Sequence, residues 1–217
     1  MSALLRGRRR GRPRQRGQAL VEFTLLLPVA MMILFGLIEF GILFTHVLTI
    51  EYAVREGARA AAALANGGGT LGCSTGQSPN WKNVDPLAIA AVERVLQSPG
   101  SQVVLASVTK IVIYKANPTT GADDQNLHNT WLYSLGTGPT PAGTTDKLNF
   151  ADATYPDSDT WKACARSNGG TIDSVGVSVT YTYTFQTPLA RIFGMFGGGS
   201  PTLSITDKTV MDLNPTS

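Results

Sequence analysis

A long apolar run near the N-terminus constrains this chain more than any other feature. The run covers residues 23–50, reads FTLLLPVAMMILFGLIEFGILFTHVLTI, and contains one formal charge, Glu39. As a helix it would rise about 42 Å, whereas the core of a bilayer requires about 20 apolar residues. We therefore predict a transmembrane helix, assigned to residues 18–50, with some length to spare outside the lipid.

The charges are distributed very unevenly along the chain. Of 18 Lys and Arg residues, seven lie in the first 16 positions with no acid among them, which leaves the remainder with 11 basic against 15 acidic residues. Under the positive-inside rule this basic end stays in the cytoplasm, and the body lies in the periplasm or outside the cell. The acidic balance of the body argues against a nucleic-acid-binding fold. The topology-setting arginines are Arg6, Arg8, Arg9, Arg10, Arg12, Arg14 and Arg16.

Three other interpretations of the N-terminus fit less well. A removable secretory signal would need a cleavage site just after the apolar run, but the A-x-A at residues 63–65 follows a polar stretch, EYAVREGAR. A twin-arginine signal, suggested by residues 8–10, normally has a weaker apolar part than this one. The arginine run could also be an arm that binds nucleic acid. Because it lies immediately before an apolar helix, a topology signal that also contacts anionic lipid headgroups is the simpler interpretation.

The most specific motif lies where the basic arm meets the apolar run. Residues 16–28 read RGQALVEFTLLLP, so that Gly17 is followed, after four residues, by Glu22 and then Phe23. An acid at the entry of a hydrophobic helix is costly to desolvate unless a cation lies nearby. A newly formed α-amino group would be such a cation.

This stretch resembles the class III prepilin signal, in which a peptidase cuts after Gly on the cytoplasmic side and leaves the apolar helix in place. The matching bond joins Gly17 to Gln18, which makes Glu22 the fifth residue after the cut. Phe23 stands where the Tad/Flp branch has an aromatic residue, usually Tyr; the ring is kept and the hydroxyl is lost. GLIEFG, VLTIEYAVREGARAAA and the C-terminal VSVTYTYTFQTPLARIFGMFGGGSPTLSITDKTVMD resemble the TadE-like family of Tad pilus assembly proteins.

The resemblance covers residues 16–65 and 174–213 and implies a function. It implies a structural, non-enzymatic minor pseudopilin of Tad (type IVb) pilus biogenesis and adhesion, anchored in the bacterial inner membrane. Its implied partners are a prepilin peptidase, other pilin or pseudopilin subunits, the Tad secretion platform and membrane lipid. It also implies that Glu22 pairs with the Gln18 amine of a neighbouring subunit after removal of residues 1–17.

Two alternatives to this function remain open. One is an uncleaved, single-pass anchored periplasmic binding domain. The other is a tethered hydrolase. It is the least favoured alternative, because the sequence contains no G-x-S-x-G elbow and no zinc-type cluster, and its two histidines are His46 and His128. For Glu39, two interpretations remain: contact with another subunit or platform protein, or an interfacial acid that reaches water. No cofactor or metal is expected.

Beyond the membrane we expect an α+β fold in which the stem helix continues over residues 51–66 and a domain covers residues 67–217. GGGTLG at residues 67–72 is a flexible exit and not a nucleotide site, because it follows a helix. Cys73 and Cys164 form an even pair in an oxidising compartment, which predicts a disulfide; two separate buried thiols are the alternative. The acidic segment with Asp152, Asp157 and Asp159 lacks the residues of a calcium loop.

Hydrophobic patterning gives the elements of this domain. We expect the last two strands to pair in an antiparallel sheet that packs on the stem. The expected elements are a helix with Asp85 as N-cap over residues 85–98, a strand over 102–115, a surface excursion carrying Trp131 and Tyr133 over 115–160, a short helix over 161–166, strands over 175–186 and 202–212, and between these an apolar connection over 187–199 that rests on the membrane, a neighbour or the sheet.

Overall fold

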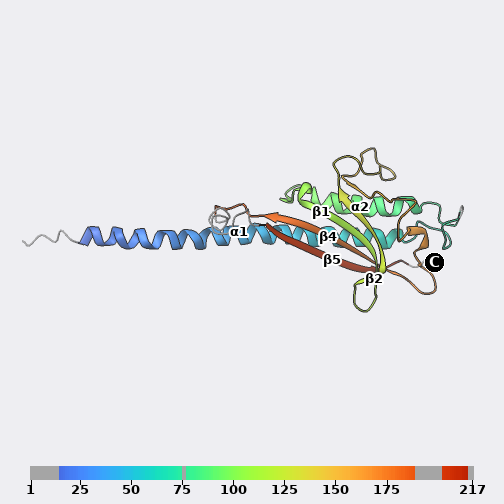
Figure 1. Cartoon of the computed structure of the whole chain (residues 1–217), viewed down its shortest axis with the longest axis horizontal. Helices are drawn as coiled ribbons and strands as arrows, with labels where there is room; N and C mark the ends of the chain where they lie inside the picture. The colour runs from blue at the N-terminus through green and yellow to red at the C-terminus, as the bar shows by residue number, and fades with distance from the viewer. Residues whose placement is uncertain (1–14, 75–76, 189–201, 215–217) are drawn as a thin grey trace, which may run out of the picture.

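The structure is a computed structural model that describes residues 15–74, 77–188 and 202–214 of the 217-residue chain. One long helix, α1 (Gln15–Leu64), carries a small domain on its C-terminal half (Figure 1), which confirms the predicted α+β class. The remaining elements are η1 (Trp81–Asn83), α2 (Val84–Leu96), η2 (Leu105–Ser107), β1 (Val108–Ala116), β2 (Asp123–Tyr133), β3 (Phe150–Ala151), η3 (Ala163–Ala165), β4 (Ser174–Thr184) and β5 (Thr202–Asp212).

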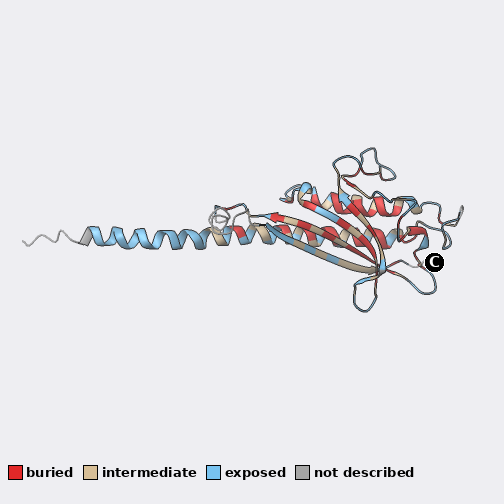
Figure 2. Ribbon diagram, in the orientation of Figure 1, coloured by how far each residue is buried: buried red, intermediate tan, exposed pale blue. Residues whose placement is uncertain are grey.

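Helix α1 divides into two halves with different surroundings (Figure 2). Residues 17–38, which we call the exposed stem, are exposed or partly exposed along their whole length. From Glu39 onward one face is buried at helical spacing, and small residues dominate it near the C-terminus. The buried residues of this docked half are Glu39, His46, Ile50, Ala53, Val54, Gly57, Ala58, Ala61 and Ala62.

Small residues let α2 approach α1 closely. A Cβ built on Gly57 would overlap Cγ2 of Val92 in α2, so a larger residue there would push the helices apart. Helix α1 ends at Leu64, close to the predicted end of the stem helix at residue 66. Ala65 and Gly67 take left-handed φ angles of 47° and 86°, which stop the helix there.

The sheet is antiparallel, with the order β3-β2-β1-β4-β5. β4 and β5 pair over their full length, from Ser174 opposite Asp212 to Thr184 opposite Thr202, as predicted. The inward face of the sheet shares one hydrophobic core with α1 and α2, and α1 lies against β4 and β5. The predicted alternation of β4 is confirmed by its buried inward residues, Val175, Val177, Val179, Tyr181 and Tyr183.

The predicted surface excursion over residues 115–160 is wrong. It contains β2, whose Trp131 is fully buried opposite Ile111, and the short β3. The first strand begins at Val108 and not at residue 102, and the predicted helix over 161–166 is a single 3₁₀ turn, η3. Most of the apolar connection predicted over 187–199 lies outside the described residues.

The N-terminus of α2 also differs from its prediction. Asn83, and not Asp85, occupies the N-cap position, and α2 ends at Leu96. Asp85 lies in the first turn, where Oδ1 is 2.7 Å from Nη1 of the fully buried Arg166 and Oδ2 accepts a hydrogen bond of 2.8 Å from Asn129. A buried arginine requires such a partner, so this group joins α2, β2 and the segment before β4.

Cys73 and Cys164 form the predicted disulfide. The bridge connects the segment after α1 to η3, and the amide of Gly72 donates a hydrogen bond of 3.0 Å to the carbonyl of Cys164 beside it. The bonded residues are separated by 91 positions, so the bridge removes much freedom from the unfolded chain.

We expect replacement of both cysteines by serine to lower the free energy of unfolding by about 4–5 kcal/mol, the value of the chain-entropy model for a loop of this size. Denaturant unfolding of the detergent-solubilised chain, followed by the fluorescence of the buried Trp131 and Trp161, measures the loss. A reducing agent should shift the unfolding midpoint of the native chain and not that of the double variant. An unchanged midpoint in the native chain under reducing conditions would contradict the prediction.

Candidate functional site

More than half of the large hydrophobic residues that are exposed in the described chain lie in the exposed stem. It presents large side chains to its surroundings on every face, among them Leu20, Phe23, Leu25, Ile33 and Leu37. Residues 17–38 rise about 33 Å as a helix, close to the thickness of a bilayer core of about 30 Å. Within the described residues, α1 is the one helix that is long and apolar enough to cross a membrane, which makes it a candidate anchor.

The residues of the predicted cleavage motif lie at the start of this stem. Gly17, Gln18 and Glu22 are in the first turns of α1, and Nε2 of Gln18 donates a hydrogen bond of 3.0 Å to Oε1 of Glu22. Phe23 is 63% exposed. The structure thus places the side chains of Gln18 and Glu22 together, one helical turn apart. The side chains of the seven leader arginines lie outside the part of the chain that the structure describes.

Glu39 marks the other end of the exposed stem, and its carboxylate is held by the same chain. The residue is 6% exposed, and Oε1 accepts hydrogen bonds from the Tyr183 hydroxyl and, at 2.9 Å, from the amide of Gln186. Oε2 accepts a hydrogen bond of 2.7 Å from the amide of Thr187. We call Glu39 with these three donors the carboxylate latch. A buried carboxylate with three donors is well satisfied despite its apolar surroundings.

Two tyrosines and His46 extend the latch along α1. His46 lies seven residues after Glu39, hence on nearly the same helix face, and its Nδ1 is 2.9 Å from the hydroxyl of Tyr181. Its ring meets that of Tyr183 edge-on, with centroids 5.2 Å apart. Burial and the Glu39 carboxylate raise the pKa of the Tyr183 hydroxyl above its ordinary value, so this group stays protonated and donates.

The latch fixes where the head, residues 67–188 and 202–214, meets the stem. Tyr183 lies at the end of β4, and Gln186 and Thr187 follow it, so the sheet is bonded to α1 at the level where the helix becomes exposed. Sequence reasoning singled out Glu39 but missed its partners in its own chain. The contacts described here are intramolecular, and an assembly role for Glu39 stays a prediction.

Structural contacts make up the site where the stem meets the head. Its groups are an apolar helix surface, one satisfied carboxylate and protonated tyrosines, which hold elements together. Within residues 15–74, 77–188 and 202–214, no three His, Cys, Asp or Glu side chains are grouped so that they could hold a metal ion.

The chain has a stem-and-head architecture. One half of a single helix is exposed and apolar, and the other half is docked on an antiparallel sheet. This arrangement is typical of a protein anchored by one helix. Residues 17–59 match the family model described as TadE-like protein. The match starts at Gly17 and covers the exposed stem and much of the docked half. Comparison with curated proteins found no match, and comparison with solved structures also found none.

The family match and the apolar helix together support a membrane protein that is associated with Tad pili. TadE-like proteins are structural components of these pili and are not known as enzymes. The sequence resemblance is confirmed for residues 17–59, whereas the resemblance noted at the C-terminal strands has no match of its own.

Proposed function

We propose that this chain is a minor pseudopilin of the Tad pilus. It is a non-enzymatic subunit of pilus biogenesis and adhesion, held in the bacterial inner membrane and processed by a prepilin peptidase between Gly17 and Gln18. The observation that carries the proposal is the exposed stem, an apolar helix surface with no partner in its own chain among the described residues, which begins at the motif of Gly17, Glu22 and Phe23. Such a surface can contact lipid while the subunit is in the membrane, and neighbouring stems once the subunit is in the pilus.

We place the membrane boundary near Ile38, not at Ile50 as the apolar run predicts. Residues 39–50 carry the latch and pack on β4 and β5, so this part of the helix is used by the head. Residues 18–38 still rise about 32 Å, which is enough for the bilayer core. In this arrangement the arginine leader, residues 1–17, is cytoplasmic and the head lies outside the cytoplasm.

Assembly would then depend on charge at the inner end of the stem. Scission removes the arginines and creates the α-amino group of Gln18, which Glu22 of a neighbouring subunit neutralises as the apolar stems bundle. A paired charge in an apolar bundle selects one register between neighbours more than it adds stability. The partners of this step are the peptidase, other pilin or pseudopilin subunits, the Tad secretion platform and the lipid.

Replacing Gly17 by leucine tests the processing step without disturbing the fold. A Cβ at this position would meet no atom within 4 Å, so the substitution leaves the chain itself unstrained. We expect the bulk of the introduced side chain to block the peptidase, so that the chain recovered from membranes keeps residues 1–17 and is absent from sheared pili. Intact-mass analysis of the membrane fraction provides the readout.

The matched control is Gly36→Leu, because Gly36 lies in the same exposed stem and its Cβ would also meet no atom within 4 Å. This variant should be cut like the native chain. If Gly17→Leu is also shortened by 17 residues, the scissile bond is elsewhere. If neither the variant nor the native chain is shortened, the chain is an uncleaved anchor for a periplasmic binding domain.

A further inference from the structure

The acidic segment of the head, residues 152–161, is fastened to β2. The amide of Trp161 donates a hydrogen bond of 3.2 Å to Oδ1 of Asn129, and the ring of Tyr155 packs against that of Trp131 with centroids 5.0 Å apart. Asn129 and Trp131 are buried residues of β2. A charge within the segment therefore acts on the contact between the segment and the sheet.

Asp159 is the buried acid of this segment. The residue is 8% exposed, and among the described residues its carboxylate forms no salt bridge. Its one described hydrogen-bond contact is to the hydroxyl of Thr154, at 3.4 Å from Oδ1. A carboxyl group that is removed from water without a cation or a strong donor disfavours its ionised form.

Thr154 joins Asp159 to a second carboxyl group, that of Asp152. The Thr154 hydroxyl donates a hydrogen bond of 2.7 Å to Oδ1 of Asp152, whereas Oδ2 of Asp152 is buried and has no hydrogen-bond partner among the described residues. A hydroxyl has one proton to donate and two lone pairs that accept. Because Asp152 takes that proton, an ionised Asp159 lacks a donor here, whereas a protonated Asp159 can donate to the hydroxyl oxygen.

The charged groups on the surrounding elements are largely paired with one another. These pairs are Arg166 with Asp85 of α2 at 2.7 Å, Lys82 of η1 with Asp157 at 3.1 Å, and His128 of β2 with Asp123 at 2.6 Å. Lys162, the next residue after the segment, forms no salt bridge among the described residues. Burial, together with the negative charges of Asp85 and Asp152, raises the pKa of Asp159 from its ordinary 3.8 to about 6.

From this geometry we propose that Asp159 and Asp152 share one proton through Thr154, and that this proton fastens the acidic segment to β2. When the proton is bound, Asp159 donates to the Thr154 hydroxyl, which donates to Asp152. When the proton is released to water, two ionised carboxylates face one hydroxyl and the segment is held less tightly. The segment is thus a pH-sensitive contact of the head, independent of the pilus role of the stem.

The direction of the effect follows from the pKa. The pKa of Asp159 in the folded head lies above that of an aspartate in an unfolded chain, so the stabilisation is complete below the ordinary value and is lost as the pH rises through about 6. Through this group alone, the folded state should be favoured about tenfold more at pH 5 than at pH 8.

Asp159→Asn tests the proposal, because its amide has the shape of the neutral carboxyl group and can donate to Thr154 at every pH. Denaturant unfolding of the detergent-solubilised full chain is followed by tryptophan fluorescence at pH 5 and pH 8. We expect the unfolding equilibrium constant of the native chain, divided by that of the variant, to rise about tenfold between these pH values. This ratio cancels the groups that both chains share, His128 among them.

The matched control is Asp157→Asn, which neutralises an exposed acid of the same segment that is paired with Lys82. Its ratio to the native chain should change by less than about twofold between pH 5 and pH 8. Carboxyl-carbon NMR of the native chain, with the Asp159 signal assigned through its backbone, should show a titration midpoint near 6. The proposal is overturned if this signal titrates near 3.8, or if the ratio for Asp159→Asn is the same at both pH values.

Discussion

Glu22→Ala is expected to reduce incorporation of this chain into pili at least a hundredfold while leaving the chain in the membrane. If the proposed scission occurs, every assembled stem carries a Gln18 ammonium group into an apolar bundle. Removing one partner of such a pair leaves an uncompensated charge at a cost of about 3–5 kcal/mol, which corresponds to a factor of at least a hundred. Immunoblots of sheared pili, normalised to the membrane fraction, measure the effect.

The head should be unaffected by this substitution. Glu22 lies in the exposed stem, and its one described hydrogen bond is to Gln18 in the preceding turn. Glu51→Ala is the matched control: it removes another acid of α1, whose partner Arg55 is an exposed residue one turn away. Exposed ion pairs contribute about 0–1 kcal/mol, so this variant should assemble normally. Native-level pilus incorporation of Glu22→Ala would refute the charge-pairing step.

Glu39→Ala is expected to destabilise the head by about 3–5 kcal/mol, the second large effect. The substitution removes the acceptor of Tyr183, Gln186 and Thr187 together, and buried donors without an acceptor cost about 1–3 kcal/mol each. Denaturant unfolding followed by tryptophan fluorescence measures the loss. Hydrogen exchange should also show faster exchange at the amides of Gln186 and Thr187.

A graded series separates the latch from a general effect of the substitution. Tyr183→Phe removes one donor and keeps the carboxylate bonded to two amides, so we expect a smaller loss of about 1–2 kcal/mol. Glu51→Ala again serves as the control on the same helix, with a change below about 1 kcal/mol. If Glu39→Ala unfolds at the native midpoint, the latch does not hold the head on the stem.

The sequence predicted the elements with strong periodicity. Stem, β4 and β5 follow from a long apolar run and from the alternation of valines and tyrosines with threonines and serines, because burial of one face enforces these patterns. The cysteine pair was predictable from its even count together with the expected export of the domain. Cleavage after Gly17 and the pairing of Glu22 remain predictions.

β2 was missed because its composition is typical of loops. It begins with two aspartates and contains two asparagines, which are depleted in strands. A weak signal was present, since Leu127, Trp131 and Tyr133 recur with period two, and the polar residue of that face, Asn129, is paired with Asp85. The surrounding structure overrides the propensity by satisfying the buried amide.

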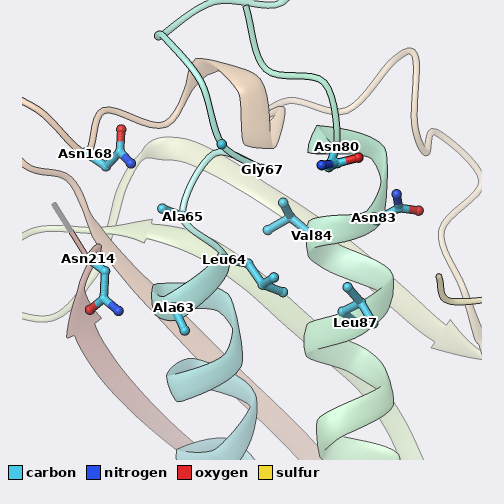
Figure 3. Close-up of a pocket in the computed structure, with 11 residues that line it drawn as sticks. Ala63, Leu64, Ala65, Gly67, Asn80, Asn83, Val84, Leu87, Asn168 and Asn214 are labelled. Atoms are coloured by element: carbon cyan, nitrogen blue, oxygen red, sulfur yellow. The ribbon is translucent and has the colours of Figure 1, made fainter. Parts of the chain in front are cut away.

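The carboxylate latch could not be derived from local patterns. Glu39 and Tyr183 are 144 positions apart, and their contact depends on the register of β4 against α1. The pocket between the C-terminal end of α1 and the start of α2 (Figure 3) likewise combines residues from segments that are remote in sequence. Such positions follow from the assembled fold, in which each element is placed by partners that are remote in sequence.

The first residue of the protein in native cell envelopes tests the central claim most directly. N-terminal analysis of the membrane and pilus fractions should identify Gln18 as the first residue, with none of the leader arginines retained. A protein whose N-terminus still carries the arginine leader in both fractions would contradict the account.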